Sequence, residues 1–152
     1  NRAFASWHPN IKELIQEAHE EELYEWGLFD RPAMNTWFKG RTTLIGDACH
    51  PMLPFLAQGA AMAVEDAWVV AREVTQKPSP ARGLEAYQHL RQTRTGRVQA
   101  RSRANAKTFH KRTWAGQLAT YGPMWLAGKF APKAVHKRQD PLYGYDVTRL
   151  QD

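Results

Sequence analysis

The chain has 152 residues, of which 43% are hydrophobic and 24% are charged, and its formal net charge is +6. This composition is typical of a globular protein with a core and excludes a disordered chain. No apolar run approaches the roughly 20 residues of a transmembrane helix, and the single cysteine, Cys49, excludes an internal disulfide. We therefore expect a cytoplasmic protein that does not bind a membrane. Because the chain begins at Asn1 and not at a methionine, we also expect it to be a piece of a longer protein.

The first elements are predicted from capping and periodicity. Asn10 and Glu13 have the spacing of a capping box, and the apolar residues that follow have helical spacing. This pattern predicts a helix from Asn10 to about Glu21. An extended segment is predicted over residues 23–29, where apolar and aromatic residues gather before Arg31-Pro32.

A turn at residues 39–41 leads into a short strand. The strand is predicted over Thr42–Ile45, which are β-branched and apolar. Strands of this composition are typically buried on both faces of a parallel sheet, which is the arrangement that we expect here.

Two helices and an irregular region are predicted next. The first helix should run from Gly59 to about Val74. Ser79 caps the second, with Pro80 at its first position, and this helix should extend to about Lys111. Its apolar stripe is thin beyond Leu90, which predicts a helix that lies across a surface. Residues 113–130 are interrupted by three glycines and a proline, so we expect an irregular aromatic segment there.

Charge is unevenly distributed along the chain. Residues 11–30 hold seven acidic residues and one lysine, whereas residues 91–112 hold eight lysines or arginines and no acid. Such a basic block can attract phosphate or another anion. It can also form a solvated helix face or pair with an acidic surface, and the sequence does not choose among these.

The segment TTLIGDACHPMLPFLAQGAAMAVEDAW, residues 42–68, carries the strongest functional signal. A strand that ends at Asp47 places a carboxylate at the edge of a sheet, where it can accept hydrogen bonds from sugar hydroxyls. Two prolines stiffen the loop that follows. Residues 58–61 then open a helix with little side-chain bulk, and its unpaired amides suit an anionic group. These features describe a site for a large cofactor with sugar, pyrophosphate and a flat ring; the alternative is a connection without a ligand.

GDACHPMLPFLAQGAAMAVEDA resembles the second flavin-binding motif of the class A FAD-dependent aromatic hydroxylases. Within that family it is most similar to salicylate hydroxylase, 3-hydroxybenzoate 6-hydroxylase and 6-hydroxynicotinate 3-monooxygenase. Residues 24–31, 91–110 and 143–146 also resemble segments of these enzymes, so the resemblance covers nearly the whole chain.

The resemblance implies a set of FAD contacts. These are Asp47, Pro54, Ala57, Gln58, Gly59, Ala60 and Ala61. Asp47 should bind hydroxyls of FAD, Pro54 should line the isoalloxazine, and the amides of residues 59–61 should face the pyrimidine edge of the flavin. Phe55 and Leu56 should border the substrate pocket, and no catalytic residue is assigned.

The resemblance also implies the fold and the partners. The expected class is α/β, with this chain as the C-terminal fragment of a Rossmann-like FAD-binding fold that is mostly helical with a few strands. Residues 1–38 should end the substrate-binding domain, 39–112 should complete the FAD-binding domain and 113–152 should form an aromatic tail. The Gly-x-Gly-x-x-Gly motif that binds the ADP half of FAD is absent from the printed sequence. The expected partners are therefore an N-terminal FAD-binding portion, on the same or a separate chain, and a small aromatic acid.

The implied activity is hydroxylation of that acid with FAD, NAD(P)H and O2, in a full enzyme that forms a homodimer. Two other functions remain open. One is a non-catalytic remnant or interaction subunit derived from a hydroxylase. The other is a basic helical module that binds nucleic acid, with Phe109 and Trp114 stacking on bases. No nucleic-acid motif is present, so we expect no nucleic-acid partner.

Other residue pairs around the motif have weaker interpretations. Asp47 and His50 could form an acid–base pair, and Cys49 could be a nucleophile. A structural role is favoured for Cys49, and packing or helix capping is favoured for Glu65 and Asp66. The histidines have no zinc-like spacing with Cys49, so no metal site is expected.

Overall fold

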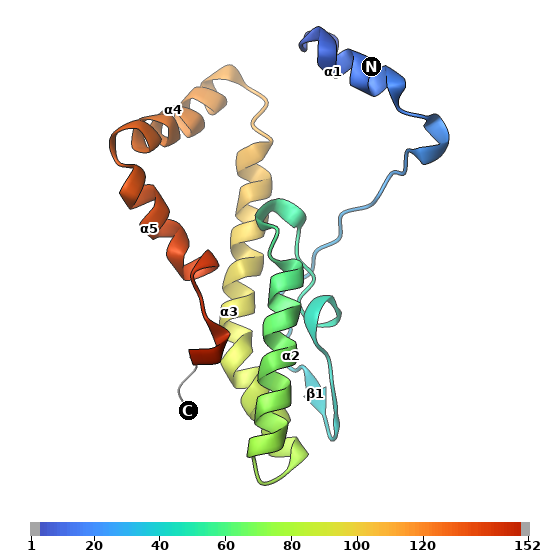
Figure 1. Cartoon of the computed structure of the whole chain (residues 1–152), viewed down its shortest axis with the longest axis vertical. Helices are drawn as coiled ribbons and strands as arrows, with labels where there is room; N and C mark the ends of the chain where they lie inside the picture. The colour runs from blue at the N-terminus through green and yellow to red at the C-terminus, as the bar shows by residue number, and fades with distance from the viewer. Residues whose placement is uncertain (1–3, 150–152) are drawn as a thin grey trace.

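Two long helices form the body of the molecule in the computed structural model, which describes residues 4–149. They are α2 (Gly59–Gln76) and α3 (Pro80–Phe109), which lie side by side and are joined by a short turn (Figure 1). Both helices are confirmed close to their predicted bounds. The described chain is mostly helical with one two-stranded sheet, which agrees with the expected balance of elements.

The turn between α2 and α3 brings the two helices into close contact. The Ser79 hydroxyl accepts a hydrogen bond of 3.4 Å from the Arg82 amide, so the predicted cap of α3 is confirmed. A Cβ atom at Gly83 would lie 2.7 Å from the Cα of Val74, well inside van der Waals contact. The backbones of the two helices therefore touch at a position where only glycine fits.

The core consists of two small apolar clusters along this hairpin. The first contains Trp37, Cys49, Val69 and Tyr87. The second contains Leu56, Met62, Val98 and Leu142. Beyond Leu90 the inward face of α3 is polar, as the thin apolar stripe indicates. The expectation that α3 lies across a surface is nevertheless wrong, because the polar side chains there are buried and bonded to α2 and to the loop before it.

Residues 38–43 form a hairpin, which corrects the predicted parallel strand. β1 (Phe38–Lys39) pairs antiparallel with β2 (Thr42–Thr43) around a left-handed Gly40, whose φ is +61°. Leu44 and Ile45 are 36% and 42% exposed, so burial on both faces is also wrong. A parallel strand needs a further strand beside it, and residues 4–149 contain none besides these two.

Two helices follow α3 where an irregular segment was predicted. They are α4 (Trp114–Phe130) and α5 (Pro132–Tyr143), which fold back beside the α2–α3 helical hairpin (Figure 1). The Thr113 hydroxyl caps α4 by accepting a 3.2 Å hydrogen bond from the Gly116 amide. Glycine in a helix interior costs only about 1 kcal/mol, so it does not by itself end a helix. α4 also tolerates Pro123 in its interior.

The start of the chain extends away from the body as an arm (Figure 1). Its helix α1 (Pro9–Glu17) begins before the predicted cap, because the His8 imidazole accepts a 3.3 Å hydrogen bond from the Asn10 amide. Asn10 is therefore inside the helix, and α1 ends before Glu21. Residues 23–29 are extended but belong to no strand. No helix within residues 4–149 is long and apolar enough to cross a membrane.

Candidate functional site

The predicted cofactor-binding residues gather where the loop after β2 meets the start of α2. Asp47 lies on a short helical turn, η3 (Gly46–Ala48), and its side chain is exposed. A Cβ atom at Gly59 would lie 3.8 Å from Oδ1 of Asp47. The fold thus brings an exposed carboxylate beside the first residue of α2, although Asp47 lies on a helical turn and not at the end of a strand as expected, because β2 ends at Thr43.

The start of α2 is open to solvent and to a ligand. Its N-cap residue, Gln58, makes no side-chain capping bond, and the first turn contains no acidic residue. The amides of Gly59, Ala60 and Ala61 therefore have no intrahelical acceptor, and no other acceptor for them lies in the described chain. By contrast, hydroxyls cap α3 and α4. These amides form a partly positive surface that suits an anion.

The chain enters α2 through a rare backbone conformation. A short turn, η4 (Pro54–Leu56), ends at Ala57, whose φ of 51° is left-handed. A residue with a side chain seldom adopts this conformation, and such residues cluster at binding sites. Pro54 and Ala57 are both exposed, so this turn presents a small apolar surface next to the open helix start.

Polar side chains of α3 donate hydrogen bonds to backbone carbonyls of the loop before α2 and so fix its position. They donate to three loop carbonyls: Gln99 to Pro51 at 2.8 Å, Ser102 to Leu53 at 2.5 Å and Asn105 to Phe55 at 3.3 Å. The three donors are spaced three residues apart and so lie on one face of the helix. The loop position is thus set by hydrogen bonds to α3 as well as by its prolines.

A buried ion network anchors the turn at Gly46. Oδ2 of Asp66 accepts hydrogen bonds from the Gly46 amide at 2.9 Å and from His50 Nε2 at 2.5 Å. Oδ1 of Asp66 accepts a 2.8 Å bond from Nε of Arg91. Arg91 continues to Glu65 at 2.5 Å. Asp66, His50 and Arg91 are almost fully buried, so α2 and α3 together fix the turn that carries Asp47.

The network sets the charge of His50. Burial lowers the pKa of the imidazole, but the hydrogen bond to Asp66, the nearby Cys49 and the negative charge of Asp66 outweigh burial and raise this pKa to about 9. For Asp66 burial has the opposite effect and raises the pKa. Hydrogen bonds from His50, Arg91 and the Gly46 amide outweigh burial, so the pKa of Asp66 is lowered overall. At neutral pH the two side chains therefore form a buried ion pair.

The geometry bears on several of the weaker interpretations. His50 pairs with Asp66 and not with Asp47, which points toward Gly59 instead. Cys49 is buried and its thiol bonds to the Gly46 carbonyl at 3.4 Å, which agrees with a structural role. Atoms of Cys49, His50 and Asp66 lie within 4.8 Å of one another. Both carboxylate oxygens of Asp66 are already hydrogen-bonded, and the Arg91 charge opposes a further cation, so this cluster is an ion pair rather than a metal site.

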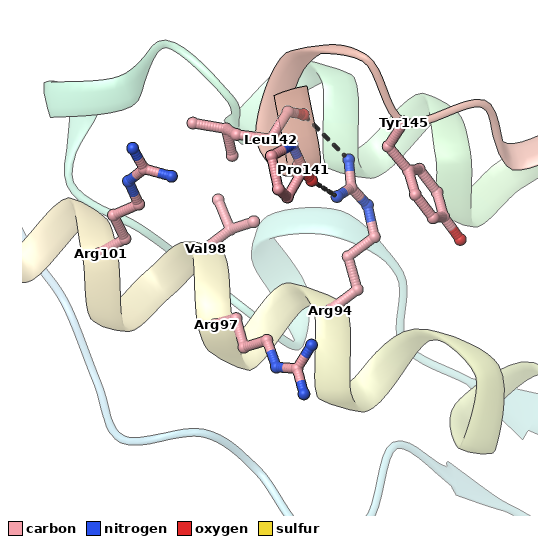
Figure 2. A pocket seen from close by; sticks show the side chains of 7 residues that line it. All are labelled: Arg94, Arg97, Val98, Arg101, Pro141, Leu142 and Tyr145. Atoms are coloured by element: carbon pink, nitrogen blue, oxygen red, sulfur yellow. Dashed lines mark hydrogen bonds between the residues drawn. The ribbon is translucent and has the colours of Figure 1, made fainter. Parts of the chain in front are cut away.

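Arg94 is an anchor that the sequence reading did not identify. Its guanidinium makes two 2.8 Å bonds to Glu65 and also donates to the carbonyls of Pro141 and Leu142, at 3.0 and 3.3 Å (Figure 2). The same group lies 3.7 Å from the centre of the Tyr145 ring. The adjacent acids in α2 and the spacing of arginines in α3 were the available signal. Their ion pairs replace the packing and capping roles expected for the acids.

The two predicted substrate contacts differ in their surroundings. Leu56 is 7% exposed and belongs to the core. The Phe55 ring lies edge-on to the rings of Phe109 and His110, with centroids 6.0 and 5.6 Å apart. Of the two, Phe55 has the more accessible side chain. Contacts with FAD or a substrate by any predicted residue stay predictions.

Comparison with known proteins gives a consistent group of relatives. Residues 1–102 match the FAD binding domain family. The chain is 47% identical over 124 residues to 3-hydroxybenzoate 6-hydroxylase 1 of Aquipseudomonas alcaligenes, covering 81% of the chain and 30% of that protein. It is 46% identical over 111 residues to a 3-amino-4-hydroxybenzoate 2-monooxygenase of Streptomyces platensis, covering 71% and 27%. It is 39% identical over 128 residues to 6-hydroxynicotinate 3-monooxygenase of Bordetella bronchiseptica, covering 83% of the chain and 30% of that protein.

A solved structure shares the arrangement of the elements. HpxO of Klebsiella pneumoniae, complexed with FAD and uric acid, aligns with a TM-score of 0.74 at 27% identity over 80% of this chain and 31% of its own. A variant of HpxO complexed with FAD aligns with a TM-score of 0.79 at 25% identity, over 92% and 36%. The chain thus spans about a third of the length of each of these proteins.

Proposed function

Because the chain belongs to the FAD binding domain family of flavin-dependent aromatic hydroxylases, we propose that it is the C-terminal part of a monooxygenase that hydroxylates a small aromatic acid with NAD(P)H and O2. The observation that carries this proposal is the exposed Asp47 carboxylate beside the uncapped start of α2. A carboxylate and a row of free amides are complementary to different parts of one cofactor, the hydroxyls and the electron-rich ring edge of FAD.

The residues present fit FAD. Asp47 is exposed and would accept hydrogen bonds from its hydroxyl groups. The free amides of residues 59–61 would donate to the pyrimidine edge and stabilise negative charge there, as a helix start does for other anions. The small side chains of Gly59, Ala60 and Ala61 let a flat ring approach the backbone, and Pro54 with Ala57 would line its face. When bound, FAD supplies the redox chemistry with NAD(P)H and O2.

The rest of the chain would hold these contacts in place. The Asp66 network fixes the Gly46 turn, and the α3 donors fix the loop carbonyls. Positioning of this kind lets binding groups act without reorganisation when charge develops. Phe55 would then border the aromatic substrate, with Leu56 supporting the loop from the core.

A flavin site of this kind needs a second half. The ADP part of FAD requires a glycine-rich turn, which we propose an N-terminal portion supplies, on the same or a separate chain. The sheet of that Rossmann-like portion would also cover the exposed Leu44 and Ile45. We propose that residues 1–38 complete its substrate domain, and that the whole enzyme is a cytoplasmic homodimer.

A chimera tests the proposal. This chain would replace the matching segment of the Aquipseudomonas alcaligenes hydroxylase, and bound FAD and hydroxylation would be measured. Asp47→Ala should weaken FAD binding by about 10- to 100-fold, the effect of losing a charge-assisted hydrogen bond worth roughly 1.5–3 kcal/mol. Asp140→Ala, at an exposed carboxylate of α5, is the matched control.

Two outcomes separate the alternatives, and a second experiment covers a chimera that does not fold. A folded chimera in which Asp47→Ala and Asp140→Ala bind FAD equally would contradict the placement of the site. A chimera that binds FAD but hydroxylates nothing would favour a non-catalytic remnant. If the chimera does not fold, the same two variants are compared in the chain co-expressed with the N-terminal portion of that relative.

A further inference from the structure

The part of the basic block that lies on α3 contains two arginines that the ion network leaves without an acid. Three others are paired with carboxylates, namely Arg91, Arg94 and Arg103. Among the described residues, Arg101 donates only to the neutral side chain of Gln139, at 2.8 Å. Arg97 is exposed and bonds to no other group in residues 4–149. Two uncompensated positive charges therefore lie one helical turn apart on α3.

These two arginines flank a cavity between α3 and the segment after α5. The cavity has a volume of about 390 Å³, and its apolar wall consists of Val98, Pro141, Leu142 and Tyr145. Small-molecule sites typically occupy about 300–1,000 Å³. No acidic residue within residues 4–149 lines the cavity. An apolar wall with cations at its rim suits a molecule that has an apolar body and a negatively charged end.

Arg94 gives this cavity a fixed wall. Its guanidinium is held by Glu65, by two backbone carbonyls and by the Tyr145 ring, so it is not free to turn toward a ligand. Figure 2 shows Val98 and Leu142 close together beside it, while Arg97 and Arg101 leave the helix in different directions. Arg97 breaks no hydrogen bond when it rotates. Arg101 can keep its bond to Gln139 and still offer its remaining N–H groups.

We propose that this cavity binds a small organic carboxylate, with its apolar body against Val98 and Leu142 and its carboxylate between Arg97 and Arg101. A guanidinium matches the two oxygens of a carboxylate with two parallel N–H groups. The apolar wall favours a carboxylate on a ring or short carbon chain over a bare inorganic anion. None of the residues predicted to contact FAD lines the cavity, so this site is independent of the proposed flavin site.

Methyl and arginine side-chain NMR of the 152-residue chain tests the proposal. Benzoate, cyclohexanecarboxylate, inorganic phosphate and benzyl alcohol are titrated separately at constant ionic strength, because surface electrostatics depends on salt. The two carboxylates should shift the Val98 and Leu142 methyl signals and the Arg97 and Arg101 Nε–H signals in a saturable way. Phosphate, which lacks the apolar body, and benzyl alcohol, which lacks the charge, should give little or no saturable shift.

A charge-matched pair of double variants gives the control. Arg97→Gln with Arg101→Gln should weaken benzoate binding by about tenfold or more, because both ionic donors are lost. Arg82→Gln with Arg112→Gln removes the same net charge at exposed positions outside the cavity, and should leave benzoate binding unchanged. Benzoate shifts that do not saturate, equal losses in both double variants, or phosphate binding as tight as benzoate binding would each overturn the proposal. Loss of FAD binding in the chimera would not bear on it.

Discussion

The α2–α3 hairpin buries charged side chains, whereas helix α4 leaves its apolar side chains exposed. The hairpin encloses charged and polar side chains, among them Asp66, Glu73 and Arg91. Helix α4 is richer in apolar residues, yet none of its side chains is buried, and Trp114 and Phe130 are 76% and 73% exposed. Burial in this chain therefore follows position in the fold more than hydrophobicity. The buried charges are tolerated because each is paired and hydrogen-bonded.

The N-terminal arm repeats the pattern of α4. Trp26 and Phe29 on the arm are 81% and 84% exposed, whereas Trp37, where the chain joins the body, is 3% exposed. Contiguous exposed aromatic side chains mark surfaces that another part of a protein covers. Within the described residues, the N-terminal arm and α4 thus differ from the α2–α3 hairpin because no other element covers their aromatic side chains. This supports the proposal of a longer or two-part enzyme.

The buried network offers the largest test of this contrast. Arg91→Ala removes one of the two cations that pair with the buried Asp66, together with a partner of Glu65, and should destabilise the chain by about 3–5 kcal/mol. Arg82→Ala breaks an ion pair whose side chains are 72% and 59% exposed, and should change stability little. Urea unfolding followed by circular dichroism measures both variants. Similar losses for the two would show that the buried network does not hold the body together.

A pair of methionines compares the body with α4 directly. Met62 is fully buried and Met124 is 56% exposed. Met62→Ala should cost about 2–5 kcal/mol through lost burial and the cavity that remains. Met124→Ala should change the free energy of unfolding by less than about 0.5 kcal/mol. A large loss at Met124 in the same urea experiment would mean that α4 is packed against a partner in solution.

The ion pair of His50 predicts a pH dependence. The pKa of His50 is about 9 in the folded chain against an ordinary 6.5. Because the folded-state value is raised, the stabilisation is fully present below pH 6.5 and is lost as pH rises through 9. The loss should amount to about 3 kcal/mol. His50→Gln should flatten the curve of unfolding free energy between pH 6 and 10, whereas His89→Gln, on an exposed side chain, should leave its slope intact.

Two glycines of α3 sharpen the comparison at the smallest scale. Gly83→Ala inserts a methyl group 2.7 Å from the Val74 backbone and should destabilise by about 1–3 kcal/mol. Gly96→Ala meets nothing within 4 Å and should stabilise by up to about 1 kcal/mol, since alanine favours the helix. Thermal unfolding gives the sign of both changes. A lower stability of Gly96→Ala would indicate that another part of the protein or a partner packs against that side of α3.

The sequence reading was most accurate where a local rule and the tertiary contacts agree. The end of α2 and the start of α3 follow from the helix cap at Ser79 and the proline at position 80, and both signals act within a few residues. The predicted parallel strand at Thr42–Ile45 was wrong. Composition indicates that a strand has apolar faces to bury, but it does not indicate which strands pair with it or which elements cover it. The sequence reading was also wrong for 113–130, because glycine lowers helix stability without forbidding a helix.

The sequence by itself determined the family, the short stretch that carries the candidate cofactor contacts, and the open start of α2, because these depend on residues adjacent in the chain. Only the tertiary structure decided the partners of Asp66, Arg91 and Arg94. Each of those bonds joins residues more than fifteen positions apart, and a buried charge can be neutralised by any opposite charge that the fold brings near. The same physics separates the paired arginines from Arg97 and Arg101, which the sequence shows as one uniform basic block.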